Sequence, residues 1–266
     1  MASLTVWAKQ QIRRLFAIRR PTMFGTARIY EDSDGVNHVR VLDMGGTYQS
    51  ATYLDTRWYL VPFRYLMLFD RVFEAQIPIR NVCMLGGGGY AYPKQLIALH
   101  PEARIDVVEI DPAITNIAKE FFYLDRLIDT YHLQENGRLG IYSEDALTYL
   151  QRCQARGRRY DAIMNDCFVV EQKDSSLETA AALKTIHDCL VPNGLYLINV
   201  ISALEGDLSS SLTDLLALAA SEFGHVHALS CGKVRNDEVD NMVIVASDLD
   251  HGIRDAIHLY DSLSDV

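Results

Sequence analysis

The chain has 266 residues, of which 49% are hydrophobic and 23% are charged. This composition is ordinary for a globular protein and excludes extensive disorder. The formal net charge of −10 disfavours nonspecific binding of nucleic acid, because neutralising phosphates requires clustered lysine and arginine, whereas a cationic substrate would be attracted.

The five cysteines show neither CxxC spacing nor pairing with histidine, so the sequence predicts free thiols and no metal site. Cys167 follows a candidate site residue, but the sequence offers no obvious base to activate it as a catalytic thiol. No apolar run has the length of a membrane span, and the N-terminus lacks the order of a signal peptide. We therefore expect a cytoplasmic protein.

The N-terminal part of the chain changes pattern twice. Residues 4–16 have helical spacing with a basic face, which could be solvated, contact another subunit or touch a membrane. Short strands are expected next, because β-branched and aromatic residues recur between turn signals, at 26–31, 38–43 and 47–53. Residues 57–73 are aromatic with a helical period and are predicted as one helix.

From Asn81 onward, strand and helix patterns alternate. The predicted strands are 82–85, 105–110, 139–142, 162–165 and 195–200, and the predicted helices are 93–99, 112–122, 144–154, 177–190 and 207–223. Two further strands at the end suit an edge hairpin, and a closing helix is expected, at 225–230, 241–246 and 250–263.

This alternation predicts an α/β fold with a mostly parallel sheet that is covered on both faces and carries an antiparallel edge hairpin. The expected organisation has three parts. They are an N-terminal extension (1–22), a small N-terminal β domain with a helix (23–75), and a nucleoside-binding domain (76–266).

Gly86 to Gly89 follow the first strand of the alternating region. Glycines lack Cβ atoms, so the backbone can turn sharply there and let a nucleotide-type ligand approach its amide groups. The alternative is a flexible glycine-rich turn, since a lone glycine motif is weak. Ligands of doubly wound sheets bind beyond the carboxyl ends of the strands, so other site residues are expected at those ends.

Acidic residues stand at three of these strand ends. Glu109 follows Gly86 by 23 positions, close to the roughly twenty expected for an acid that binds ribose hydroxyls. Its alternative role is as a charge at the start of the next helix, which Asp111 fills better. Asp145, followed by Ala146, could accept a hydrogen bond from an adenine amino group.

Two questions stay open at these ends. Ser143 could cap the following helix, with Asp145 merely favouring its positive end. Asp166 follows the fourth strand, where its carboxylate could accept a proton or orient an amine, or could serve only as a cap for the following loop.

Together these segments resemble the spermidine synthase family, the polyamine aminopropyltransferases, whose fold is that of class I methyltransferases, a Rossmann-like domain preceded by a small β domain. The resemblance covers residues 26–247, and the stretches that carry it are LDMGGTYQSA, VCMLGGGG, VVEID, SEDA and DAIMNDCF.

The resemblance implies aminopropyl transfer from decarboxylated S-adenosylmethionine to a small-molecule amine in polyamine biosynthesis, without a metal, by a homodimer formed through the N-terminal region. The family's residue roles carry over to matching positions. They are cofactor binding by Gln49, Glu109 and Asp145, proton acceptance by Asp166, and a place near the polyamine channel for Tyr65. Gly86, Gly87, Gly88 and Ala146 are expected to bind the cofactor beside them.

Three family positions differ in this chain. Gly89 replaces the aspartate that holds the amine of the decarboxylated cofactor, and Leu66 and Val169 replace a polar and an acidic residue. The missing carboxylate predicts a gap beside Tyr90 and would admit intact S-adenosylmethionine. A methyltransferase, or a nucleoside-binding protein without catalysis, is therefore the alternative to an aminopropyltransferase.

Overall fold

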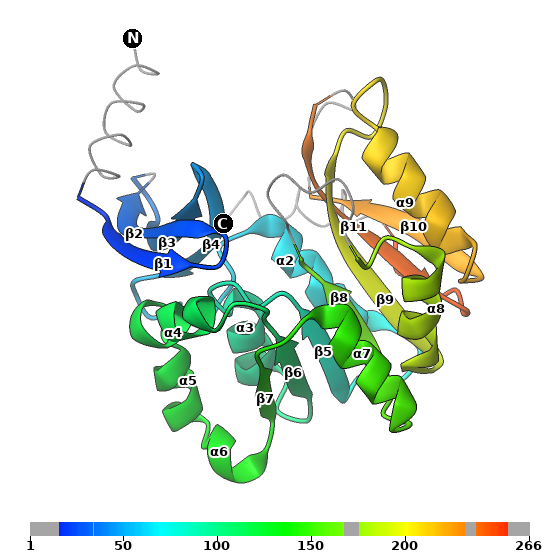
Figure 1. Cartoon of the computed structure of the whole chain (residues 1–266), viewed down its shortest axis with the longest axis horizontal. Helices are drawn as coiled ribbons and strands as arrows, with labels where there is room; N and C mark the ends of the chain where they lie inside the picture. The colour runs from blue at the N-terminus through cyan, green and yellow to red at the C-terminus, as the bar shows by residue number, and fades with distance from the viewer. Residues whose placement is uncertain (1–15, 34, 168–175, 232–237, 255–266) are drawn as a thin grey trace.

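The computed structural model describes residues 16–33, 35–167, 176–231 and 238–254, which form two β-sheets with helices packed around the larger one (Figure 1). The helix expected at 4–16 lies outside the described residues except for its last residue, which forms a turn. Of the closing helix expected at 250–263, only 250–254 are described, and they are irregular.

The smaller sheet is antiparallel, with the strand order β1-β2-β3-β4. Its strands are β1 (Ile18–Thr22), β2 (Gly25–Ser33), β3 (His38–Met44) and β4 (Thr47–Tyr53). The last three strands match the predicted ones. β1 occupies residues assigned to the N-terminal extension and pairs with β2 across a tight turn at Met23 and Phe24.

The single helix predicted at 57–73 is wrong in its first part. Residues 57–59 form a turn and residues 60–63 are irregular, and only α2 (Arg64–Phe69) and the 3-10 helix η1 (Asp70–Glu74) are helical. Pro62 explains the late start, because its ring fixes φ and it has no N–H to donate to a preceding turn. Phe63 is extended, with φ −98° and ψ 131°, and the helix begins after it.

In the described residues the larger sheet has seven strands in the order β10-β11-β9-β8-β5-β6-β7. They are β5 (Asn81–Leu85), β6 (Arg104–Val108), β7 (Leu139–Tyr142), β8 (Tyr160–Asn165), β9 (Leu190–Ser202), β10 (His225–Ser230) and β11 (Asp240–Ser247). β9, β8, β5, β6 and β7 run parallel, and β11 and β10 form the antiparallel edge. This confirms the predicted fold class.

Helices cover both faces of this sheet. They are α3 (Ala91–Leu99), α4 (Pro112–Phe121), α5 (Leu124–Thr130), α6 (Leu133–Asn136), α7 (Ala146–Ala155), α8 (Ala180–Asp188) and α9 (Ser210–Ala220). The short helices α5 and α6 were not predicted. No helix in the described part of the chain is long and apolar enough to cross a bilayer.

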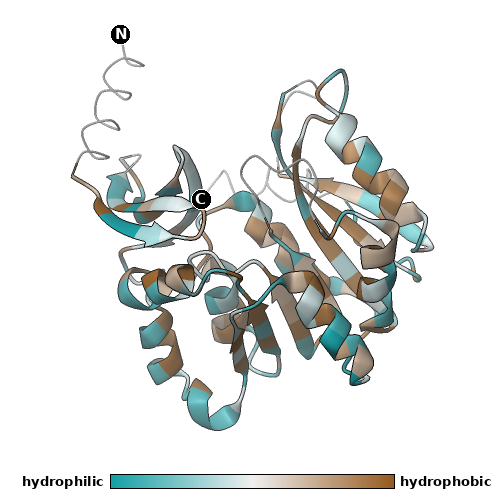
Figure 2. Cartoon of the chain, in the orientation of Figure 1, coloured by the Kyte–Doolittle hydropathy of each residue, from teal (hydrophilic) through white to brown (hydrophobic). Residues whose placement is uncertain are grey.

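The strand sequence explains why both faces are covered. In β5, Val82 and Met84 face the core beneath α2, α3, α4 and α5, whereas Cys83 and Leu85 face the core beneath α7, α8 and α9. Figure 2 shows the same arrangement, with apolar central strands and polar residues on the outward side of α5, α6 and α7.

The smaller sheet and the larger one share an apolar core. Ala27, Ile29 and Leu42 of the smaller sheet belong to the same buried cluster as Leu96 of α3 and Ile117 of α4. The cavity described below therefore has walls that are fixed to one another by packing. The division of the chain at residues 75 and 76 stays a prediction.

Lys94 of α3 lies fully buried between the two sheets. Its ammonium nitrogen donates hydrogen bonds to Thr52 Oγ1 of β4 at 2.7 Å and to the Phe122 carbonyl oxygen at 3.0 Å. Burial lowers the pKa of Lys94 to about 7, because a charged ammonium loses its hydration in the protein interior.

We expect Lys94→Met to gain stability relative to the wild type at pH 7 and to lose that gain toward pH 10. Between about pH 7 and 10.5 the unfolded chain binds a proton at Lys94 that the folded protein does not, so wild-type stability rises with pH there. The difference between the two proteins should change by about 1.4 kcal/mol for each pH unit in this window.

Urea denaturation at several pH values measures this difference. Lys119→Met is the matched control, because Lys119 is exposed on α4 and should show no such trend. If the difference in unfolding free energy between Lys94→Met and the wild type did not vary with pH, the lowered pKa of Lys94 would be contradicted.

Candidate active site

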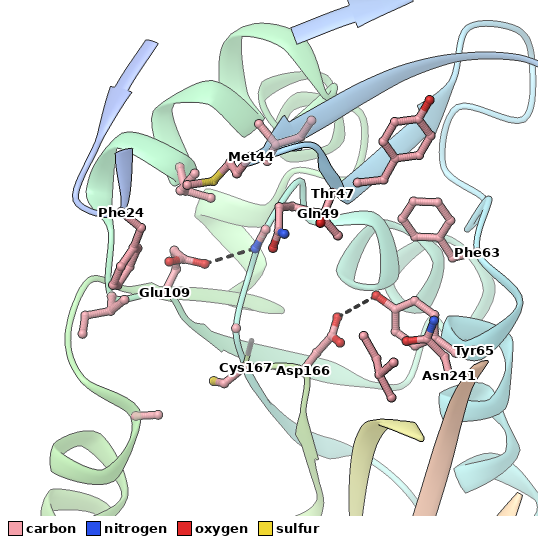
Figure 3. A pocket seen from close by; sticks show the side chains of 18 of the residues that line it. Phe24, Met44, Thr47, Gln49, Phe63, Tyr65, Glu109, Asp166, Cys167 and Asn241 are labelled. Atoms are coloured by element: carbon pink, nitrogen blue, oxygen red, sulfur yellow. Dashed lines mark hydrogen bonds between the residues drawn. The ribbon is translucent and has the colours of Figure 1, made fainter. Parts of the chain in front are cut away.

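A cavity of about 860 Å³ lies between the smaller sheet, α2 and the carboxyl ends of β5, β6 and β8 (Figure 3). β5 and β8 are adjacent, and the strand order reverses between them, which is where ligands bind in this fold. The volume is in the range of small-molecule sites. Eight predicted site residues line the cavity, namely Gln49, Tyr65, Gly86, Gly88, Glu109, Asp145, Ala146 and Asp166, whereas Gly87 does not.

The loop after β5 needs glycine at its first position. Gly86 has φ +89°, and a Cβ added there would lie 2.6 Å from the backbone oxygen of Asp166. Gly88 also has a positive φ, and its added Cβ would lie 3.7 Å from the Gln49 backbone oxygen. The smaller sheet thus approaches the loop closely.

Glu109 holds the glycine loop through its carboxylate. Oε2 accepts hydrogen bonds from the N–H groups of Gly87 at 2.9 Å and Gly88 at 3.1 Å, and Oε1 accepts from the Asp111 N–H at 3.0 Å. A carboxylate offers about four acceptor sites, so about one is left for a ligand hydroxyl. The alternative role at the helix start belongs to Asp111, which caps α4 through the Ala113 N–H at 2.9 Å.

Asp145 is the N-cap of α7. Its Oδ1 accepts from the backbone N–H of Thr148 at 2.8 Å and from the Thr148 hydroxyl at 2.9 Å. The cap is therefore Asp145 rather than Ser143, while the residue also lines the cavity together with Ala146. Recognition of adenine by Asp145 stays a prediction.

Asp166 lies at the end of β8 and accepts two side-chain hydrogen bonds. Tyr65 of α2 donates its hydroxyl to Oδ2 at 3.1 Å, and Asn199 of β9 donates its amide to Oδ1 at 2.8 Å. Burial raises the pKa of Asp166 to about 7, although both hydrogen bonds favour the charged form. Asn199 was not predicted as a site residue, and its one signal in the sequence is that it is a polar residue inside an apolar strand.

The prediction of a gap beside Tyr90 is wrong. A Cβ added at Gly89 would lie 2.6 Å from Ser50 Oγ and 3.1 Å from the ring of Phe122, so these side chains close the space. Tyr90 adopts a left-handed conformation with φ 57°, and its buried hydroxyl lies 3.1 Å from Thr115 Oγ1.

Of the other two family positions that differ, one falls within the described residues, and it does not line the cavity. Leu66 is buried in the apolar core, so a polar side chain there would be unfavourable. Val169 lies outside the described residues.

The cavity carries more negative than positive charge. Five carboxylates line it, compared with Arg64 as the one cation among the described lining residues. Glu144 is paired with Arg152, and Glu109 and Asp145 are engaged by N–H donors as described above. Such a lining attracts a cationic ligand.

Other residues that line the cavity were not predicted from the sequence, because they follow no recognisable spacing. Examples are Phe24, Phe63, Arg64 and Asn241.

The strand order and the loop after β5 define a Rossmann-like protein of the class I methyltransferase fold. The family can be stated more narrowly. Residues 67–207, more than half of the chain, match the model of the spermine/spermidine synthase domain, and the chain belongs to that family.

Individual relatives are of two kinds. The chain is 30% identical over 122 residues to a polyamine aminopropyltransferase of Vibrio vulnificus, a match that covers 46% of this chain and 38% of that protein. It is 28% identical over 145 residues to the eEF1A lysine and N-terminal methyltransferase homolog of Drosophila melanogaster, covering 51% of this chain and 20% of that protein. The chain thus spans well under half the length of either relative.

Among solved structures, the fold resembles that of a probable spermidine synthase from Corynebacterium glutamicum. The TM-score is 0.70 at 19% sequence identity, and the match covers 93% of this chain and 85% of the other. At this identity the likeness concerns the fold.

We expect Glu109→Gln to lower the free energy of unfolding by about 2 kcal/mol, because a neutral amide cannot accept from all three N–H groups and directs its own N–H₂ toward one of them. Thermal and urea denaturation measure this loss. Glu144→Gln is the matched control, since Glu144 lines the same cavity but is paired with the partly exposed Arg152, and it should cost under about 1 kcal/mol. Equal losses in the two variants would refute the role given to Glu109.

Proposed function

We propose that the protein transfers an alkyl group from an adenosyl sulfonium co-substrate to an amine, with Asp166 as the proton acceptor. The observation that carries this proposal is the position of the Asp166 carboxylate in the same cavity as the glycine loop and Glu109. Burial raises the pKa of this carboxylate to about 7. A base with a pKa near neutrality accepts a proton effectively at the pH of the cell interior. Family membership and the negative lining of the cavity support the proposal.

The residues fit such a co-substrate. Glu109 can offer an acceptor to a ribose hydroxyl, Asp145 and Ala146 can meet the adenine, and Gln49 can reach the ligand from the smaller sheet. When bound, the sulfonium supplies a carbon that is open to nucleophilic attack.

Asp166 removes the proton from the ammonium form of the acceptor, and the freed lone pair forms the new N–C bond. The electrons of the broken C–S bond stay on sulfur as a neutral thioether, and the proton remains on Asp166. Tyr65 and Asn199 hold the carboxylate in place through their hydrogen bonds, so positioning contributes to the rate. The positive charge of the sulfonium passes to the nitrogen of the product, which forms as an ammonium ion, so protons, electrons and charge all balance.

The transferred group in the first candidate function is aminopropyl, from decarboxylated S-adenosylmethionine to a small-molecule amine in polyamine biosynthesis. Membership of the spermine/spermidine synthase domain family and the Tyr65–Asp166 pair support it. A cytoplasmic homodimer formed through the N-terminal region belongs to the same proposal.

The second candidate is methyl transfer from intact S-adenosylmethionine. The observation that favours it is the contact at Gly89, where Ser50 and Phe122 leave no room for the carboxylate that would hold the amine of the decarboxylated donor. The similarity to a protein methyltransferase supports this candidate too.

We expect turnover to rise with pH through about 7, since only deprotonated Asp166 accepts a proton. Tyr65→Phe should move this midpoint to higher pH, because it removes a hydrogen bond that favours the carboxylate. Asp166→Asn should bind the donor and lose turnover by about a hundredfold or more. The pH profile of kcat, with intact and decarboxylated donor and a set of amines, measures these effects.

Tyr48→Phe provides the control for this prediction. Tyr48 also lines the cavity, but its hydroxyl donates to Asp32 at 2.7 Å and not to Asp166, so the midpoint should not move. Full turnover by Asp166→Asn would remove Asp166 from the role of base.

The two candidates predict opposite donor preferences. An aminopropyltransferase should bind decarboxylated S-adenosylmethionine at least about tenfold more tightly than the intact form, a difference of about 1.4 kcal/mol. Calorimetric titration of the wild type with both forms measures this ratio. Equal or reversed affinity would reject aminopropyl transfer. If neither donor form bound, both candidates would be rejected.

A further inference from the structure

Phe24 stands at the tip of the tight turn between β1 and β2 and lines the cavity. The turn is held internally, because the Phe24 N–H donates to Thr22 Oγ1 at 3.2 Å and the same hydroxyl donates to the Gly25 carbonyl oxygen at 2.8 Å. The position of Phe24 is therefore set by the turn as well as by the strands.

A hydrogen bond between distant parts of the chain fixes this turn to the nucleoside side of the cavity. The Met23 N–H donates to Asp111 Oδ2 at 2.6 Å, and Asp111 is only 1% exposed. The other oxygen of Asp111 caps α4, and its own N–H is bound by Glu109. The turn that carries Phe24 is thus connected by successive hydrogen bonds to the carboxylate that holds the glycine loop.

Phe24 is one of the exposed large apolar residues of the described chain. It is 52% exposed, and no other aromatic ring contacts it among the described residues. Ile110, which follows Glu109 and lines the same cavity, is also 40% exposed. Figure 3 shows the Phe24 ring beside Glu109 at the edge of the cavity. Apolar side chains that converge in this way on a cavity gain free energy when an apolar ligand surface covers them.

We propose that Phe24 forms the outer wall of the donor site, and that the adenosine moiety of the co-substrate packs against its ring. The inference rests on the proposed function, because Glu109 and Asp145 define which end of the cavity receives the nucleoside. Purine bases have a flat π-face, for which an aromatic ring is a suitable partner. The smaller sheet then contributes a donor-binding residue, Phe24, in addition to Gln49.

Phe24→Ala tests the proposal, with 5′-methylthioadenosine as the calorimetric probe. This thioether nucleoside carries the adenosine moiety that both donor forms share, so its affinity reports on the nucleoside end of the cavity. We expect its Kd to rise about tenfold, in line with the loss of one aromatic stacking partner. Phe24→Tyr and Phe24→Trp should stay within about threefold of the wild type, because they keep the ring.

Phe16→Ala is the matched control, since Phe16 is 84% exposed and does not line the cavity. The Kd of this variant for 5′-methylthioadenosine should equal that of the wild type. The midpoint of thermal unfolding and the KM for the acceptor amine should be the same in Phe24→Ala as in the wild type. A general disturbance of the fold would change both.

The two ways of failing can be told apart. Wild-type affinity in Phe24→Ala, with weakened binding in Asp145→Ala, would overturn the role of Phe24 and leave the proposed function in place. Absence of binding of the thioether nucleoside and of both donor forms by the wild type would overturn the proposed function and this inference with it.

Discussion

The carboxylate of Glu109 is the interaction on which the rest of the site depends. It accepts from two amide groups of the glycine loop and from the amide of Asp111, so one side chain joins the end of β5, the end of β6 and the start of α4. The amide dipoles of the loop point toward a compensating negative charge. Asp111 extends this set of contacts to the smaller sheet through Met23. Hydrogen bonds thus connect the glycine loop, the end of β6, the start of α4 and the smaller sheet, and these connections hold the cavity in shape.

Much of the larger sheet was predictable, because its signals are local. A short apolar run followed by glycines, and an acid at the end of the next run, identify β5 and β6 without tertiary information. The strand-end rule then brings Glu109, Asp145 and Asp166 to one edge of the sheet, where the structure places them. The chemistry of each acid could not be predicted in the same way, because the cap formed by Asp145 depends on Thr148 and the pKa of Asp166 depends on its burial.

The features that sequence analysis missed depend on contacts between distant residues. Phe24 faces the cavity because the neighbouring Met23 is hydrogen-bonded to Asp111, 88 positions away in the sequence. Lys94 is buried because β4 and the end of α4 enclose it, although its residue type favours the surface. Within the stretch predicted as one helix at 57–73, α2 begins only after Pro62 and Phe63, so the proline was a local signal to which the prediction gave too little weight.

The contact between Gly89 and Ser50 constrains how such a site can evolve. An aspartate at position 89 would meet the hydroxyl and Cβ of Ser50 before it reached a ligand. Replacing Gly89 alone would therefore be unfavourable unless Ser50 shifted or was replaced as well. The effects of substitutions at 50 and 89 should therefore depend on each other, because the space that a side chain at 89 would need is occupied by the hydroxyl and Cβ of Ser50.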